Sequence, residues 1–75
     1  SDYSILIIGE DISIDSLTIP AGQKIYLDLN NKTLTVTGGD ITVNGELVIS
    51  EFGDISFTSG SIVTGADGSV TDKRQ

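Results

Sequence analysis

The chain has 75 residues, so it forms at most one small domain, which buries only about 60–65% of the surface that the unfolded chain exposes. It contains no cysteine and no histidine, which excludes a disulfide framework and a zinc site built on thiolates or imidazoles. The net charge of -7 has the wrong sign for nucleic acid or anionic lipid, and most side chains that enzymes use are missing. We therefore expect a protein that is not an enzyme, with no cofactor and no nucleic-acid or membrane partner.

The composition favours an all-β fold. Ile, Val and Thr supply 24 of the 75 residues, and these β-branched residues suit a pleated sheet better than a helix. Short segments in which apolar and polar residues alternate predict a series of strands. In chain order the apolar positions are Ile5/Ile7, Ile12/Ile14, Leu17/Ile19, Ile25/Leu27/Leu29, Leu34/Val36, Ile41/Val43, Leu47/Ile49 and Ile55/Phe57, followed by Ile62 and Val70. Glycine, asparagine and aspartate between these segments predict tight turns.

The spacing of the strands predicts a short parallel β-solenoid. If two strands form a unit, the first strands begin at Ile5, Leu17, Leu34, Leu47 and Ile62, and the second at Ile12, Ile25, Ile41, Ile55 and Val70. Both series recur at roughly 14–15 residues, which is typical of coils that stack in register. We expect about four to five coils in a single domain over 1–75, excised from a longer chain and ending in a polar tail at 71–75. Because Asn44-Gly45 is a strong hairpin signal, an antiparallel β barrel or sandwich is the alternative.

Two segments in the middle of the chain resemble a known family. Leu17–Val36 reads LTIPAGQKIYLDLNNKTLTV, and Ile41–Ile49 reads ITVNGELVI. Both are similar to consecutive coils of right-handed parallel β-helix proteins of the pectate-lyase-like type, which occur in bacterial surface proteins and in tailed-phage fibres and spikes. The chain departs from the pattern at Asn31, where glycine is usual. The resemblance implies a fibre or surface module, and a homotrimer if the source is a phage fibre; it implies no catalytic residue.

Residues that carry chemistry are few and scattered. The acidic residues considered are Asp11, Asp15, Asp28, Asp40, Glu46, Glu51, Asp54 and Asp67. We interpret them as turn-capping and solubilising residues, and we predict no catalytic, cofactor-binding or metal-binding residue. The strongest candidate for a weak calcium site is the set Asp40, Glu46 and Asp54, since hard cations need several oxygen ligands. The glycosylation sequon Asn31-Lys32-Thr33 is interpreted as a chance match, and Gly65–Gly68 is not expected to bind phosphate.

The remaining signals indicate assembly. Leu6, Ile8, Val48 and Val63 fall out of phase with the predicted inward residues, which suggests a second buried face. That face would be the seam of a homo-oligomer, and cyclic symmetry about a fibre axis would make it a homotrimer. Tyr26 is expected to point outward, where its ring would be available for stacking on a sugar. The other aromatic residues, Tyr3, Phe52 and Phe57, are expected to pack in the core or in stacked ladders.

These expectations describe a non-enzymatic structural or assembly module. Its expected setting is a phage virion fibre, of the head or the tail, in which a homotrimer contacts capsid or tail proteins. The alternatives are a segment of a bacterial cell-surface adhesin and a carbohydrate-binding module that holds a surface glycan with Tyr26 and nearby acids. The expected location is the virion or the extracellular surface of a cell.

Overall fold

Ten short β-strands make up the regular structure of the chain. The computed structural model describes residues 2–74, so Ser1 and Gln75, the ends of the predicted domain, lie outside the described residues. The strands are β1 (Ser4–Ile7), β2 (Ile12–Ile14), β3 (Leu17–Ile19), β4 (Lys24–Asp28), β5 (Thr33–Val36), β6 (Ile41–Val43), β7 (Glu46–Ile49), β8 (Asp54–Phe57), β9 (Ile62–Thr64) and β10 (Ser69–Asp72). Thr71 and Asp72, within the expected polar tail, belong to β10. In the range 2–74 there is no helix that could span a membrane.

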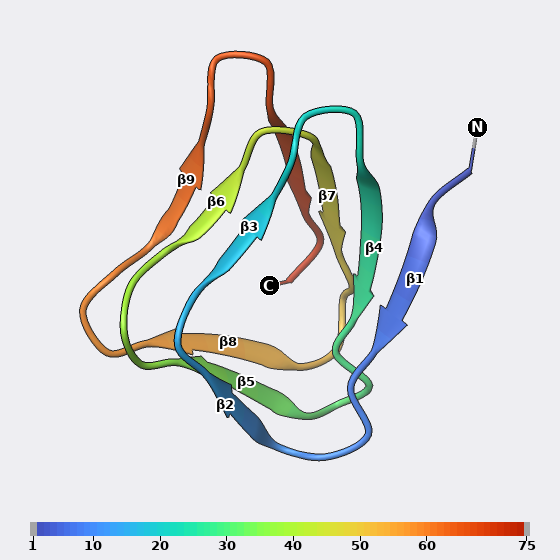
Figure 1. Cartoon of the computed structure of the whole chain (residues 1–75). Coiled ribbons are helices and arrows are strands. Elements are labelled where there is room, and N and C mark those ends of the chain that lie inside the picture. The colour runs from blue at the N-terminus through green and yellow to red at the C-terminus, as the bar shows by residue number, and fades with distance from the viewer. Residues whose placement is uncertain (1, 75) are drawn as a thin grey trace.

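The strands wind into a three-sided parallel β-solenoid (Figure 1). Sheet A has the strand order β1-β4-β7-β10, sheet B has the order β2-β5-β8, and sheet C has the order β3-β6-β9. All paired strands run in parallel, and each pairs with the strand three places along the chain. The three sheets therefore form the sides of a triangular prism. The predicted all-β parallel solenoid is confirmed, and the antiparallel barrel or sandwich is wrong.

One coil contains three strands, not the two that the spacing predicted. Ser4 pairs with Ile25, 21 positions further along the chain, and Leu17 pairs with Ile41, 24 positions further along. Residues 2–74 make three complete coils, and β10 begins another. The predicted count of four to five coils is therefore wrong. The two-strand unit joined strands of different sheets, because short corners and identical alternation make all of these strands look alike in sequence.

The Asn44-Gly45 dipeptide forms a corner of the prism and not a hairpin. It connects β6 in sheet C with β7 in sheet A, and these two strands do not pair. The amides of both residues donate to the carbonyl oxygen of Ile19 in the preceding coil, over 2.8 and 3.2 Å. A Cβ at position 45 would meet the carbonyl oxygens of Pro20 and Gln23. Glycine is required here because two stacked corners approach closely, and this is the origin of the apparent hairpin signal.

The core is a set of inward-facing aliphatic side chains that stack from coil to coil. The buried members are Ile8, Ile19, Leu27, Leu29, Leu34, Val36, Ile41, Val43, Leu47, Ile49 and Ile55. In sheet B, for example, Leu34 lies in register between Ile12 and Ile55. Branched aliphatic side chains fill such a column well because each rests on one of similar shape about 4.8 Å away. All of the buried side-chain polar atoms in residues 2–74 have hydrogen-bond partners.

The phase of β1 is the reverse of the prediction. Leu6 is in register with the buried Leu27, whereas Ile5 is in register with Tyr26, which faces outward. Leu6 and Ile8 are therefore core residues, and Ile5 and Ile7 point away from the core. The uninterrupted run Ile5–Ile8 offers two equivalent phases, and only pairing with β4 selects one of them.

The corner after β4 contains the departure from the family pattern noted above. Asn30 and Asn31 both adopt left-handed conformations, with φ angles of 55° and 60°. Asparagine tolerates this region better than other non-glycine residues. The Asn30 side chain donates to the carbonyl of Ile8 over 3.2 Å, and the Asn31 amide donates to the carbonyl of Phe52 over 3.2 Å. Asparagine thus supplies the backbone conformation of the usual glycine and ties three coils together.

Candidate assembly surfaces

The N-terminal end of the solenoid has an apolar hollow, which we call the N-terminal hollow. It has a volume of about 520 Å³ and lies among the inward side chains of the first coil, with Leu27 and Leu34 of the second coil at its floor. Leu6 is 48% exposed there, whereas Leu27, its neighbour in the same column, is 1% exposed. The hollow is therefore the uncovered end of the hydrophobic core.

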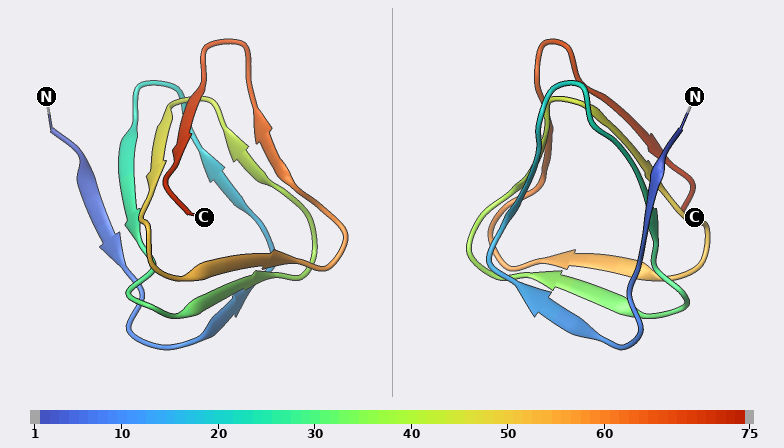
Figure 2. Two further views of the ribbon diagram at one scale, coloured as in Figure 1. Left: turned by 180° about the vertical axis from the view of Figure 1, so that it is seen from behind. Right: turned by 45° about the vertical axis from the view of Figure 1, so that its right-hand side comes forward.

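Strand β1 borders this hollow and is exposed along its whole length. Ile5 and Ile7 are 67% and 60% exposed, and Figure 2 shows β1 at the outer edge of sheet A. The amide of Ile8 donates to the carbonyl of Asp28 on β4 over 3.2 Å. Because peptide groups alternate in direction along a strand, the amide and carbonyl groups of Ile5 and Ile7 point to the free edge. β1 therefore presents apolar side chains and unpaired backbone groups together.

The outer face of sheet A carries a second apolar feature, a column of side chains parallel to the solenoid axis. Ile5, Tyr26, Val48 and Thr71 lie in register on β1, β4, β7 and β10. Of the four residues predicted to be out of phase, Val48 does face outward in this column. Val63 also faces outward and is 41% exposed, but it lies on β9 in sheet C. The predicted seam is thus reduced to sheet A, and it gains Ile5, which the sequence analysis had assigned to the core.

Polar contacts flank the two tyrosines on this face. The Tyr3 hydroxyl donates to Glu46 Oε2 over 2.6 Å, which raises the pKa of Tyr3 because the phenolate would lose that bond. Lys24 lies 3.9 Å from Glu46 Oε1 and 5.9 Å from the centre of the Tyr3 ring. Lys73 lies 5.6 Å from the centre of the Tyr26 ring. Each ring therefore has an ammonium group over one face, which competes with the stacking of a sugar.

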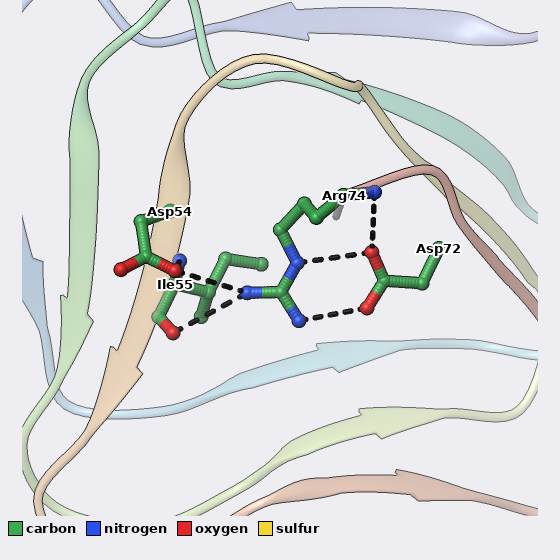
Figure 3. A network of polar contacts seen from close by, with 4 residues as sticks. All are labelled: Asp54, Ile55, Asp72 and Arg74. Carbon is green, nitrogen blue, oxygen red and sulfur yellow. Dashed lines mark hydrogen bonds and ion pairs between the residues drawn. The ribbon is translucent and has the colours of Figure 1, made fainter.

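The C-terminal end of the solenoid is closed by charged residues (Figure 3). Asp72 is in register with the inward Ile49, so it occupies a core column on the last rung. Arg74 donates to both carboxylate oxygens of Asp72 over 2.9 and 2.7 Å, and these bonds lower the pKa of Asp72 and raise that of Arg74. Its guanidinium also donates to the carbonyl of Ile55 over 3.3 Å and lies 3.5 Å from Asp54 Oδ1. Arg74 is thus a polar lid on the core, a role that the sequence analysis did not predict.

The acids considered as calcium ligands lie at separate places. Asp40 Oδ1 accepts the amide of Ser61 over 2.9 Å. Glu46 contacts Tyr3 and Lys24 on sheet A, and Asp54 contacts Arg74 at the C-terminal end. Within residues 2–74 no three acidic side chains lie close enough together to hold a metal ion.

The other acids mostly cap corners. Asp11 Oδ1 accepts the amide of Thr33 in the next coil over 2.8 Å, and Asp28 Oδ1 accepts the amide of Asn30 over 2.9 Å. The Asp15 side chain lies against Gly38, where a Cβ would meet it. Glu51 and Asp67 are exposed, and so is Asn31 of the sequon. The segment Gly65–Gly68 is the corner between β9 and β10, closed by a 3.0 Å bond from the amide of Gly68 to the carbonyl of Gly65.

Comparison with known proteins adds no relative. No family model, no curated protein and no solved structure matches the chain. The resemblance to pectate-lyase-like β-helices is supported by the parallel β-solenoid alone, and neither that family nor a phage origin has support from these searches.

Proposed function

We propose that the chain is a non-enzymatic structural module whose copies associate as a homotrimer through the outer face of sheet A. The observation that carries this proposal is the column Ile5, Tyr26 and Val48, which runs across the outside of three neighbouring strands. A β-solenoid that has completed its own core has no internal use for apolar side chains on an outer face. Large exposed apolar patches on small domains are typical of interaction surfaces.

The direction of the column suits parallel association. It follows the solenoid axis, so copies that stand side by side with parallel axes bury the whole column at once. Three copies around a common axis give a closed assembly in which every copy uses the same surface. A small domain gains stability from this burial, because its own core is limited.

The setting we propose is a fibre, either of a phage virion or of a bacterial cell surface. The support is the resemblance of residues 17–36 and 41–49 to coils found in such proteins, together with the three-sided parallel solenoid. In a virion fibre the module would contact capsid or tail proteins. In a surface adhesin the same module would act as a spacer segment outside the cell.

The test is the mass of the protein in solution. Sedimentation equilibrium at micromolar to millimolar concentrations should give three times the 7.9 kDa of one chain. Val48→Lys should give a monomer, because a desolvated charge would lie in each copy of the seam. The matched control is Ser56→Lys, an outward position on β8 in sheet B, which should leave the trimer intact. A wild-type monomer at all concentrations, or a trimer that tolerates Val48→Lys, contradicts the proposed seam.

The carbohydrate-binding alternative has less support than assembly. Tyr26 does face outward, between the inward Ile25 and Leu27. The ammonium group of Lys73 lies over its ring, however, so stacking of a sugar on that side would have to displace it. Loss of binding to a glycan array on Tyr26→Ala would revive this alternative.

A further inference from the structure

The N-terminal hollow and strand β1 together describe a binding site that the proposed trimer does not use. The trimer seam lies on the outer face of sheet A, whereas the hollow opens at the end of the prism. At this end β1, β2 and β3 are the outermost strands of their sheets, and the core side chains between them are uncovered. We ask which occupant fits three properties of this end: its backbone edge, its apolar interior and its charge.

The backbone edge calls for a β-strand. The amide and carbonyl groups of Ile5 and Ile7 point to the free edge of sheet A, as the pairing of Ile8 with Asp28 requires. Proteins usually protect an edge strand with a charge, a proline or a bulge, and Ser4–Ile7 contains no charged residue and no proline. A helix laid over the end would cover the apolar side chains but leave these backbone groups without partners. An added strand satisfies both.

The interior calls for alternating apolar side chains. In the strands below the hollow, every second residue points inward, as Leu27 and Leu34 do. A strand added to β1 would place every second side chain above Leu6 and into the hollow, whose volume of about 520 Å³ accommodates several branched side chains. Leu6 would then be covered as completely as Leu27 is.

The charge calls for basic residues. The first 23 residues contain Asp2, Glu10, Asp11 and Asp15 and no lysine or arginine. Glu10 lies at the hollow itself. The first basic residue, Lys24, is already beside Glu46. Complementary charge on a partner therefore means lysine or arginine at the ends of the added strand.

A second copy of this chain fits this end poorly. Two N-terminal ends placed face to face would bring together two acidic first coils from chains that each carry a net charge of -7. The C-terminal end of another copy would place the Asp72–Arg74 lid, a polar group with its own partners, against the apolar hollow. Either contact costs electrostatic or desolvation free energy that a basic partner strand avoids.

We infer that the N-terminal end of the solenoid binds an extended segment of a partner protein, with alternating apolar side chains and lysine or arginine at its ends, which adds to β1 as a further strand of sheet A. The apolar side chains fill the N-terminal hollow, and the basic residues face the acidic first coil.

The probe is a fluorescent synthetic peptide of alternating threonine and isoleucine or valine, with two lysines at each end. Binding to the intact 75-residue protein is followed by fluorescence anisotropy at low and high salt. We expect the lysine peptide to bind about tenfold or more tightly than a peptide with glutamate in place of lysine, with the difference shrinking at high salt. A lysine-rich amphipathic helical peptide is expected to bind weakly, because it leaves the edge of β1 unpaired.

Variants locate the binding at the hollow. Leu6→Asp should weaken the lysine peptide about tenfold or more, because it places a charge in the apolar interior. The matched control is Val63→Asp, which alters a similarly exposed apolar residue on β9 and should leave binding unchanged. Glu10→Lys, at an exposed corner, should reduce the preference for the lysine peptide without affecting the fold. Circular dichroism confirms that each variant is folded.

Four results would overturn the inference: equal binding of the lysine and glutamate peptides, no effect of Leu6→Asp in a folded protein, tighter binding of the helical peptide, and self-association that Leu6→Asp abolishes. The last would identify a second copy as the occupant. The outcome is separable from the proposed trimer, because Val48→Lys tests the seam and leaves the hollow intact, whereas Leu6→Asp does the reverse.

Discussion

The pair Leu6 and Leu27 offers a direct test of the stacked columns. The two leucines are neighbours in one column of sheet A, so they share residue type, strand environment and inward direction. They differ in that Leu27 has Leu6 on one side and Ile49 on the other, whereas Leu6 has a neighbour on one side alone. Their exposed fractions are 1% and 48%. Substituting each by alanine therefore isolates the effect of a covering rung.

The expected costs follow from this difference. For a fully buried leucine, substitution by alanine removes the transfer free energy and leaves a cavity, for a total of about 3 kcal/mol or more. The hydrogen bonds on both sides of β4 keep the coils from collapsing into the cavity around residue 27. Leu6 loses about half of the transfer term and leaves no closed cavity, so Leu6→Ala should cost about 1 kcal/mol. A chain of 75 residues has a total stability of about 4–11 kcal/mol, so the first change removes much of it.

The assay is urea unfolding followed by circular dichroism at low protein concentration. The unfolding midpoint should fall strongly for Leu27→Ala and weakly for Leu6→Ala, with unchanged slopes. Val63→Ala, an exposed outward position, should stay within about 0.5 kcal/mol of the wild type. Equal losses for the two leucines, or a loss below about 1 kcal/mol for Leu27→Ala, would contradict the register in which one covers the other.

Three further substitutions test other parts of the fold. Ile41→Asp should unfold the protein, because it places an unpaired charge at a fully buried position, whereas Thr42→Asp on the outward side of the same strand should retain a cooperative melting transition. Gly45→Ala should cost about 1–3 kcal/mol in urea unfolding, because its Cβ would push two corners apart; Gly9→Ala, with open space around it, is the control and should be nearly neutral. Asp72→Asn should cost about 0.5–1 kcal/mol at pH 7, since the pair with Arg74 is partly screened by solvent. Because Arg74 lowers the pKa of Asp72 in the folded state, this contribution is present above the unfolded carboxyl pKa of about 3.9 and disappears as the pH falls through the lowered value, so stability curves of variant and wild type should converge in acid.

The fold class was predictable because it depends on features that every strand repeats. The alternation in Leu34–Val36 or Ile41–Val43 is unambiguous, and β-branched residues at inward positions favour stacking in parallel. The number of strands in a coil was not predictable in the same way. The corner between Ile14 and Leu17 is as short as the one at Asn44-Gly45, so nothing local marks where a coil is complete. Only the long-range pairing of Ile25 with Leu47 supplies that information.

The assembly surfaces were predictable in part. The idea of a second apolar face was sound for Val48, but the phase of Ile5–Ile8 could not be read from four consecutive apolar residues. The lid formed by Arg74 was invisible in the sequence, because a long flexible side chain near the end of a chain has no preferred partner until the fold brings Asp72 and Ile55 beside it. The acidic character of the first coil, in contrast, was legible from the absence of any basic residue before Lys24.

The two ends of the solenoid solve the same problem in opposite ways, and one column shows this most clearly. It runs Leu6, Leu27, Ile49 and then Asp72. On the last rung the apolar residue is replaced by a carboxylate whose charge is met by Arg74, which is the arrangement expected where a core column faces water. On the first rung the leucine is retained although it is half exposed, and no charged group crosses over it. Since the same column can evidently end in a polar rung, an apolar rung at the other end is a choice that costs free energy in water and is recovered when a further strand covers it.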